Sequence, residues 1–252
     1  MIPSWKRTLD ILGCLAALPL LVFCTGVMTI VTRLFSPGPV LFRQERVGYK
    51  GRRFKIYKFR TMHARAATVA HEAHFRELVG SNAPMVKLDH HGDSRLLPGA
   101  RLFRATGLDE LPQIINVLRG EMSLVGPRPC LPSEAALFQP WHHERFDIQP
   151  GLTGLWQVSG KNRTTFEEMM RLDIRYARTR ALWLDLRILA LTIPALLTQV
   201  SETTSGQSSR AGADSVPPFS ALRDPEGRVV AIYAPPVKAR QPESDPVPGS
   251  VA

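Results

Sequence analysis

Two adjacent carboxylates, Asp109 and Glu110, are the residues of this sequence best placed to do chemistry. Neighbouring carboxylates repel each other and their protonation is coupled, so proteins place such pairs where a cation or a proton transfer stabilises them. Both side chains can reach one site if they lie at the exposed start of a helix, where free backbone N–H groups attract anions. Taken alone, the pair is also compatible with a charged first turn that only complements the helix dipole.

Basic side chains on both sides of the pair favour the chemical interpretation. Arg128 is presented by the rigid turn that ends GEMSLVGPRP (120–129), and its planar guanidinium suits a phosphate or a carboxylate. Arg104 precedes the pair, and KIYKFRTM (55–62) adds further positive charge. A glycine-punctuated loop, PGLTGLWQVSGKNR (150–163), follows. An acidic pair with several arginines and glycine-rich loops indicates a site for metal-bound phosphates.

The run 108–119, LDELPQIINVLR, predicts the helix that carries the carboxylates. Thr106 is a suitable N-cap, Pro112 falls in the first turns, and Gly120 ends the helix. One predicted stripe faces the core, and it consists of Leu111, Ile114, Ile115 and Leu118.

An apolar segment without charged residues, 11–32, predicts contact with a membrane. As a helix its 22 residues would reach ~33 Å, enough to cross a bilayer core. Lys6 and Arg7 precede it and more basic residues follow, so the positive-inside rule draws both ends to the cytoplasmic side. We therefore expect a re-entrant helix that bends at Pro19 or Gly26, with a full span and a soluble core helix as alternatives. A cleaved signal peptide is not expected, because the run is long and lacks a cleavage site.

The remaining elements are expected to be mainly helical. PVLFRQERV and RRFKIYKFR, separated by GYKG, predict a β-hairpin. Helices are expected over 62–80, 164–180 and 181–199, the last lying at the interface or in the core. Five histidines between 63 and 91 have no acidic or cysteine partner that would complete a zinc site. The three cysteines are expected to be reduced and buried.

The formal charge of +10 requires an anionic partner, which could be nucleic acid, membrane phosphates or a phosphorylated substrate. The tail 201–252 does not contribute to the excess, since it holds five basic and six acidic residues. Its proline- and serine-rich composition predicts disorder over most of its length. VVAIYA (229–234) is the stretch of the tail that could pair as a strand.

Six motifs in colinear order carry a resemblance to a known family: KRTLDI, SPGPVLFRQERVG, FKIYKFRTM, LDELPQIINVLRGEMSLVGPRP, PGLTGLWQVSGKNR and LWLDLRIL. They resemble the bacterial sugar transferases, the small monotopic phosphoglycosyl transferases that load polyprenyl phosphate with a sugar phosphate. The resemblance covers about residues 5–200 and leaves the tail outside. The family's re-entrant helix usually breaks at a Ser-Pro pair, where this chain has Val22 and Phe23, about one turn after Pro19.

The resemblance implies a two-step exchange at the cytoplasmic face of a bacterial inner membrane. Asp109 matches the nucleophile, which attacks the β-phosphate of a UDP-sugar, releases UMP and forms a phosphosugar–aspartyl intermediate. Polyprenyl (undecaprenyl) phosphate then accepts the sugar phosphate, in the first membrane step of polysaccharide or glycoconjugate synthesis. Glu110 matches the second carboxylate, which assists Mg²⁺ binding or proton handling, so both carboxylates are expected near the metal.

The resemblance also implies binding residues. Substrate or lipid phosphates are expected near Arg128, Arg104, Lys58 and Arg60. The loop near the nucleotide sugar is expected to contribute Gln157, Lys161 and Asn162.

The sequence thus predicts a mainly α protein with a small β-hairpin (α+β), anchored as a monotopic membrane protein. Residues 1–35 form the re-entrant helix, 36–200 the cytoplasmic transferase domain and 201–252 the mostly disordered tail. A non-catalytic scaffold that binds anionic lipid is the alternative, but a lipid-binding surface gains nothing from two carboxylates. Nucleic-acid binding is not expected, because no recognition motif accompanies the basic residues and the apolar N-terminus has no role in it.

Overall fold

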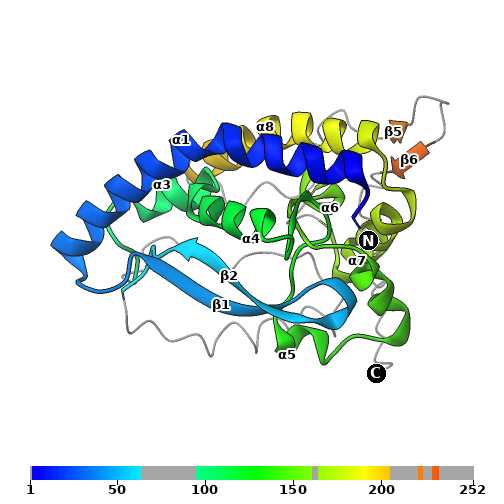
Figure 1. Ribbon diagram of the computed structural model, residues 1–252, viewed down its shortest axis with the longest axis horizontal. Coiled ribbons are helices and arrows are strands. Elements are labelled where there is room, and N and C mark those ends of the chain that lie inside the picture. Colours follow the sequence, from blue (N-terminus) through cyan, green and yellow to red (C-terminus); the bar gives the residue numbers. More distant parts are fainter. Residues whose placement is uncertain (1, 64–94, 161–163, 205–220, 224–228, 233–252) are drawn as a thin grey trace, which may run out of the picture.

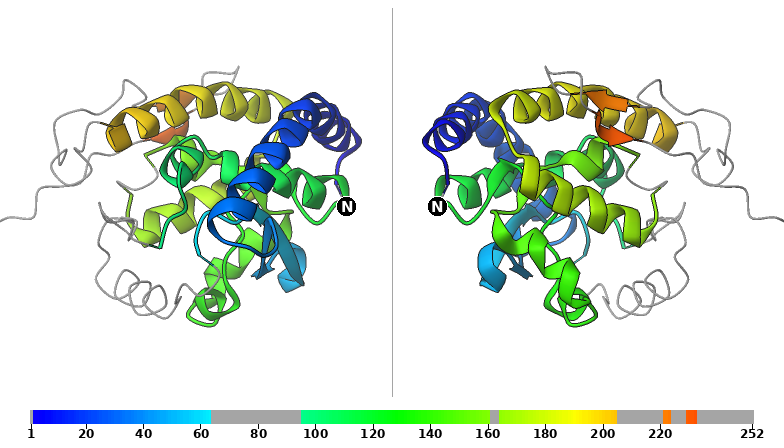
Figure 2. Two further views of the ribbon diagram at one scale, coloured as in Figure 1. Left: turned by 90° about the vertical axis from the view of Figure 1, so that its left-hand side faces the viewer. Right: turned by 90° about the vertical axis from the view of Figure 1, so that its right-hand side faces the viewer.

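The computed structural model describes residues 2–63, 95–160, 164–204, 221–223 and 229–232. Most of the predicted 62–80 helix and four of the five clustered histidines lie outside these ranges. The described part is mostly helical with a small antiparallel hairpin, as the sequence predicts. Helices α1 and α8 lie along one side of the molecule and the hairpin along the other, with α4 between them (Figures 1 and 2).

Helix α1, Ser4–Phe35, is uninterrupted and passes through Pro19 and Gly26. One stripe of it is buried along the whole length: Lys6, Asp10, Cys14, Cys24, Met28 and Thr32. Cys14 belongs to the main core with Ile114 and Val117, whereas Cys24 and Met28 pack with Phe59. The opposite face is exposed and apolar: Ile11, Leu12, Leu15, Leu20, Val22, Phe23, Ile30, Leu34 and Phe35.

The predicted hairpin is confirmed. Strands β1, Leu41–Val47, and β2, Arg53–Phe59, pair antiparallel, and the turn η1, Tyr49–Gly51, joins them. Lys50 adopts a left-handed conformation (φ 54°) within this turn. β2 packs against the segment that carries the two carboxylates.

The helix predicted for 108–119 is in fact two elements, a 3₁₀-helix η2, Leu108–Gln113, and the short α-helix α4, Ile114–Leu118. The N-cap prediction is wrong, because the hydroxyl of Thr106 donates to the carbonyl of Leu102 (2.7 Å) and closes the preceding helix α3, Ala100–Ala105. Gly120 ends α4 in a left-handed conformation (φ 77°), as expected.

The predicted apolar stripe of this helix is only partly correct. Ile114 is buried, but Leu118 is 36% exposed, and Asn116 and Val117 are buried in addition. Asn116 is satisfied by polar groups: its amide donates to the carbonyl of Lys55 and to Glu121 (2.8 Å each). A polar residue therefore fills a core position, which an apolar periodicity does not reveal.

A two-stranded parallel sheet connects the two glycine-rich motifs. β3, Ser123–Val125, pairs with β4, Gly151–Thr153. Beyond β3 the chains stay in contact, since the amide of Gly126 donates to Thr153 (2.9 Å) and that of Gly151 to Pro127 (2.8 Å). The turn that presents Arg128 is therefore fixed to β4.

The two C-terminal helices are confirmed. α7, Phe166–Thr179, begins at a capping box in which Thr165 and Glu168 bond each other's backbone. α8, Leu182–Thr204, runs past the boundary expected at residue 200. By length and composition alone, Ser4–Phe35 and Leu182–Ser201 could each cross a membrane. α1 and α8 start side by side and then diverge (Figure 2).

Three short helices and one strand pair complete the described chain: α5 (Pro132–Ala135), η3 (Pro140–Asp147), α6 (Leu155–Val158), β5 (Ala221–Arg223) and β6 (Val229–Ile232). β6 pairs antiparallel with β5, so the stretch VVAIYA does contribute a strand. All three cysteines are free and buried, as expected.

Candidate functional site

The carboxylate pair lies at the start of η2, which packs against strand β2 of the hairpin. Both Asp109 and Glu110 belong to the first turn and are partly buried. Lys58 of β2 donates to Oε1 of Glu110 at 2.6 Å, and the side chains are 22% and 41% exposed. Lys58, which the resemblance assigns to a substrate phosphate, therefore neutralises the second carboxylate in this structure.

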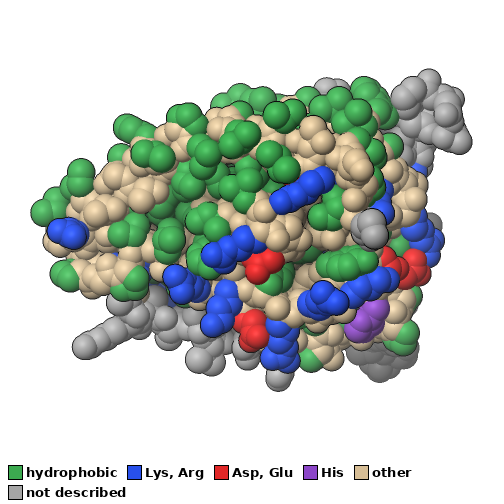
Figure 3. Space-filling view, in the orientation of Figure 1, with side chains coloured by type: hydrophobic (Ala, Val, Ile, Leu, Met, Phe, Trp, Pro, Cys, Tyr) green, Lys and Arg blue, Asp and Glu red, His purple; other side chains and the backbone are tan. Residues whose placement is uncertain are grey.

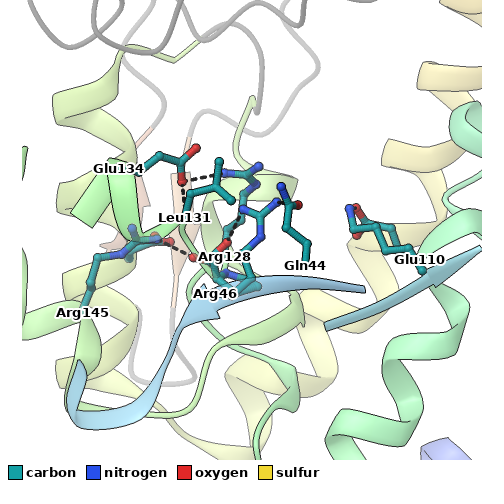
Figure 4. Close-up of polar contacts among 10 residues, drawn as sticks. Gln44, Arg46, Glu110, Arg128, Leu131, Glu134 and Arg145 are labelled. Atoms are coloured by element: carbon teal, nitrogen blue, oxygen red, sulfur yellow. Dashed lines mark hydrogen bonds and ion pairs between the residues drawn. The ribbon is translucent and has the colours of Figure 1, made fainter. Parts of the chain in front are cut away.

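Arg46 and Arg128 lie together on one side of Glu110 (Figure 4). Arg46 of β1 is buried and donates to the carbonyl of Pro129 (3.1 Å) and to Oε1 of Gln44 (2.7 Å). Arg128 is one-third exposed, and its Nη1 lies 3.8 Å from the buried Glu134. Figure 4 places Gln44, Arg46 and Arg128 between Glu134 and Glu110.

Electrostatics connects these arginines to the carboxylates. Burial, and then the positive charge of Arg128, lower the pKa of Arg46 to about 10, although Glu134 and Glu110 oppose the shift. Two neighbouring guanidinium groups repel each other, and an anion bound beside them reduces that repulsion. Because Arg128 is accessible while Arg46 is buried, Arg128 is the group that can contact a phosphate.

The structure brings some predicted residues to this site and places others elsewhere. Arg60 is buried and donates to the hydroxyl (3.4 Å) and carbonyl of Ser36, which fixes the end of α1. The carbonyl of Arg104 in α3 accepts from Gln199 of α8 (3.1 Å). Gln157 of α6 lies 3.5 Å from the carbonyl of Leu152. Lys161 and Asn162 lie outside the described residues.

A buried ion pair near the site was not predicted. Nη2 of Arg145 in η3 lies 2.5 Å from Oδ2 of Asp173 in α7, and the two side chains are 2% and 1% exposed. Arg145 also donates to the carbonyl of Arg128 (2.8 Å). Burial raises the pKa of Asp173 to about 6, although Arg145 opposes the shift. The sequence does hold a signal for Asp173, since the residue lies among the buried Met169, Met170, Ile174 and Tyr176 of an otherwise amphipathic helix.

Arg46 and Glu134 were also missed as members of the site. Arg46 lies within the motif SPGPVLFRQERVG, but the motif alone assigns it no role in a site. Glu134 follows a proline at the start of the short helix α5, where its carboxylate accepts from the amide of Leu131 (2.7 Å) and reads as an ordinary cap. Their role depends on the fold, which brings β1 and α5 to the same turn.

The carboxylates fit a divalent cation that a substrate helps to hold. Among the described residues no group of three or more His, Cys, Asp or Glu side chains could bind a metal by itself. Mg²⁺ is ordinarily bound through one or two carboxylates together with substrate phosphates and water, rather than by an all-protein cage. Asp109 and Glu110 are carboxylates of the kind that such a site uses.

A surface hollow of about 490 Å³ lies between Phe35 at the end of α1 and Gly99 and Arg101 at the start of α3. None of the predicted site residues lines it, so it does not define the site.

Comparison with known proteins gives one consistent result. The bacterial sugar transferase family matches residues 2–199. A UDP-glucose:undecaprenyl-phosphate glucose-1-phosphate transferase of Caulobacter vibrioides is 40% identical over 201 residues, which cover 77% of this chain and 70% of that protein.

Two further relatives have similar identity. An undecaprenyl-phosphate galactose phosphotransferase of Salmonella typhimurium is 36% identical over 202 residues, 76% of this chain and 40% of the relative. The exopolysaccharide production protein ExoY of Rhizobium meliloti is 34% identical over 193 residues, 76% of this chain and 84% of the relative. The chain thus spans less than half of the Salmonella protein and most of the other two.

Proposed function

Because the chain belongs to the bacterial sugar transferase family, and is therefore a transferase, we propose that it moves a sugar 1-phosphate from a UDP-sugar to undecaprenyl phosphate. The named relatives act on glucose or galactose with this lipid carrier, and another is named for exopolysaccharide production. The observation that carries the proposal is that Glu110, next to Asp109 in η2, acts electrostatically on Arg46, which neighbours Arg128.

In the first step an oxygen of the Asp109 carboxylate attacks the β-phosphorus of the UDP-sugar. The new O–P bond forms as the bond between the β-phosphorus and the bridging oxygen breaks, and UMP leaves with that electron pair. The sugar phosphate is now attached to Asp109 as an acyl phosphate. The attacking carboxylate must be ionised, and positive charge near any carboxylate favours its ionised form.

In the second step an oxygen of undecaprenyl phosphate attacks the same phosphorus. The Asp109–phosphorus bond breaks, the carboxylate is regenerated, and the product is undecaprenyl diphosphate sugar. No proton has to be stored between the two steps if both phosphates react as anions. The enzyme therefore has to bring anions together and stabilise their charge rather than transfer a proton.

The other residues have binding roles in this proposal. Arg128 contacts a substrate phosphate and Arg104 lies near the lipid phosphate, whereas the buried Arg60 holds the end of α1 through Ser36. Glu110, held by Lys58 at 2.6 Å, completes the donor set for Mg²⁺. The metal, when bound, offsets the negative charge of the diphosphate and of the carboxylates that approach it. The nucleotide-sugar loop contributes Gln157, Lys161 and Asn162.

The apolar faces of α1 and α8 suit a protein that is seated in a membrane. Exposed apolar side chains gather over α1 along the upper side of the molecule, while charged side chains lie below it (Figure 3). On α8 the exposed apolar residues are Leu182, Trp183, Leu186, Ile193 and Leu197. Patches of this extent on a protein mark a membrane or partner surface, and the family premise favours the membrane.

The contacts of α1 favour both ends on one side of the membrane over a full span, although the helix is not broken at Pro19 or Gly26. Its first turns bond the body through Lys6, and its end is held where Arg60 bonds Ser36. A helix that crossed the bilayer would carry one of these ends away from the body, so we propose that both ends lie on the cytoplasmic face of the inner membrane. Single cysteines at position 4 and position 50, in a cysteine-free background, should be labelled from the same side by an impermeant reagent. Labelling of position 4 alone from the periplasm would establish a span.

The proposal is tested by incubating the purified enzyme with UDP-glucose or UDP-galactose and measuring released UMP. We expect UMP release that is sustained only when undecaprenyl phosphate is added. A non-catalytic scaffold that binds anionic lipid would release no nucleotide from any UDP-sugar. An ordinary glycosyl transferase would release UDP instead, and this outcome would also refute the proposal.

A further inference from the structure

The turn that presents Arg128 is held through almost all of its carbonyl groups. Backbone amides satisfy two of them: Gly151 donates to Pro127 (2.8 Å) and Val47 donates to Cys130 (2.9 Å). The turn is thus fixed to β4 on one side and to β1 on the other. This arrangement leaves the carbonyls of Val125, Arg128 and Pro129 to be satisfied by side chains.

Three buried cations from distant elements meet those remaining carbonyls. Lys6 of α1 donates to Val125 (2.9 Å), Arg145 of η3 to Arg128 (2.8 Å), and Arg46 of β1 to Pro129 (3.1 Å). Hydrogen bonds to a charged donor are stronger than neutral ones and fix geometry more tightly. Each of these cationic side chains therefore bonds the backbone of the turn rather than solvent water.

Lys6 is the member of this set that comes from the membrane-facing helix. Its ammonium group has three hydrogens and three acceptors: the Val125 carbonyl, the Tyr176 hydroxyl (3.0 Å) and Oδ2 of Asp185 (2.6 Å). The Tyr176 hydroxyl in turn lies within hydrogen-bonding distance of Oδ1 of Asp185 (2.6 Å) and of the Val125 carbonyl (3.1 Å). The side chains of Lys6 and Asp185 are 1% and 0% exposed, and Tyr176 is fully buried.

Stability alone does not account for this network. Taking a lysine and an aspartate out of water costs several kcal/mol per ion, and packed apolar residues of similar size are often as stable or more so. What the ion pair adds is a defined position for each atom that it bonds. Here that position is the last carbonyl of β3, directly before the Arg128 turn.

A second contact from the same helix supports this assignment. Asp10, one turn after Lys6, accepts from the hydroxyl of Ser123 and from the amide of Leu124, both at 2.8 Å. The first turns of α1 therefore hold β3 at three consecutive residues, and β3 leads into the turn. The place of Arg128 depends on α1 being seated on the body.

We infer that Lys6, supported by Tyr176 and Asp185, is a positioning residue of the transferase site, which sets the turn that carries Arg128. The inference rests on the proposed function, in which Arg128 binds a substrate phosphate. Lys6 touches no reacting atom, so its replacement acts only through the turn. It follows that the loss caused by removing Lys6 must disappear once Arg128 has been removed.

The test compares Lys6→Met with Met28→Ala. Met28 is also buried on α1, but it packs with Cys24 and Phe59 and has no bond to the turn, so its variant controls for a weaker seating of the helix. Lys6→Met leaves Asp185 without its partner, so the pair Lys6→Met with Asp185→Asn is made as well, which leaves no uncompensated charge. Hydrogen exchange is followed at the amides of Val47 and Gly151, which bond the turn.

We expect at least tenfold faster exchange at both amides in the two Lys6 variants and no such change in Met28→Ala. We also expect kcat/KM for the UDP-sugar to fall at least tenfold in Lys6→Met, but less than threefold further when Lys6→Met is added to Arg128→Ala. Unchanged exchange, or a full additional loss in the Arg128→Ala background, would overturn the inference. A wild-type enzyme that is inactive on every UDP-sugar would instead refute the proposed function, and hydrogen exchange would still decide the role of Lys6.

Discussion

Gly151→Ala is expected to destroy the site through the backbone alone. Gly151 lies where β4 passes closest to the residues that follow β3. A Cβ atom at this position would lie 2.6 Å from the Cα of Gly126 and still closer to the Gly126 nitrogen and the Thr153 oxygen. Non-bonded carbon atoms ordinarily stay about 3.5–4.0 Å apart, so the two backbones would have to separate by about 1 Å.

The hydrogen bonds that cross this point give the size of the effect. Three backbone hydrogen bonds would be stretched. They run from the amide of Gly151 to the carbonyl of Pro127 (2.8 Å), from Gly126 to Thr153 (2.9 Å) and from Ser123 to Pro150 (2.9 Å). A buried bond that is lost costs about 1–3 kcal/mol, so we expect a loss of at least ~3 kcal/mol in unfolding free energy. In a chain of this size that lowers Tm by roughly 6–12 °C.

The assay is thermal unfolding of the detergent-purified protein together with UMP release. Gly26→Ala is the control, because a Cβ at Gly26 meets nothing within 4 Å and alanine favours a helix by about 0.5–1 kcal/mol. We expect Gly26→Ala to keep or raise Tm and Gly151→Ala to be inactive and much less stable. If Gly151→Ala unfolds within 2 °C of the wild type, the close approach of the two strands is not a feature of the folded protein.

Three other outcomes are expected. Lys58→Met should lower kcat at least tenfold, because it releases Glu110. It should change Tm by no more than roughly 4 °C, since a partly exposed ion pair contributes about 1 kcal/mol or less. Steady-state kinetics and unfolding curves check both effects, and a normal kcat would show that the bond between Lys58 and Glu110 has no role in catalysis. Exhaustive chelation should abolish UMP release and added Mg²⁺ should restore it, so full activity after chelation would remove the metal from the proposal. The pKa of Asp173 is about 6 in the folded protein and 3.8 in the unfolded chain, so the unfolding free energy should fall as pH rises between these values. In denaturant titrations Asp173→Asn should lack this fall. An identical pH profile in both proteins would exclude Asp173 as its source.

Local patterns predict most of the secondary structure that surrounds the site. The alternation and turn chemistry of 39–60 give the hairpin, and the amphipathic period and capping residues of 164–180 give α7. The carboxylate-bearing segment is less predictable, because Pro112 falls inside a 3₁₀-helix and the buried Asn116 interrupts the apolar stripe. Asn116 is stabilised there by a backbone carbonyl from β2, which no local pattern contains.

The pairing of side chains within the site depends on tertiary structure. Lys58 and Glu110 are separated by 52 residues, and only the packing of β2 on η2 brings them together. Arg46 is an ordinary strand arginine by sequence, and it is buried because the turn at Pro129 lies over β1. Lys6 was interpreted only as a topological signal, and its bonds to Tyr176 and Asp185 follow from the way α1, α7 and α8 meet.

The central claim is that Asp109 carries the sugar phosphate between donor and lipid. The most direct test is to mix the enzyme with a UDP-sugar in the absence of undecaprenyl phosphate and to measure released nucleotide and protein mass in one sample. The account predicts up to one UMP per enzyme molecule and a matching mass gain of one sugar phosphate on the peptide that contains Asp109. Asp109→Asn should show neither, although it folds and stays in the membrane. Turnover of Asp109→Asn within tenfold of the wild type would contradict the account.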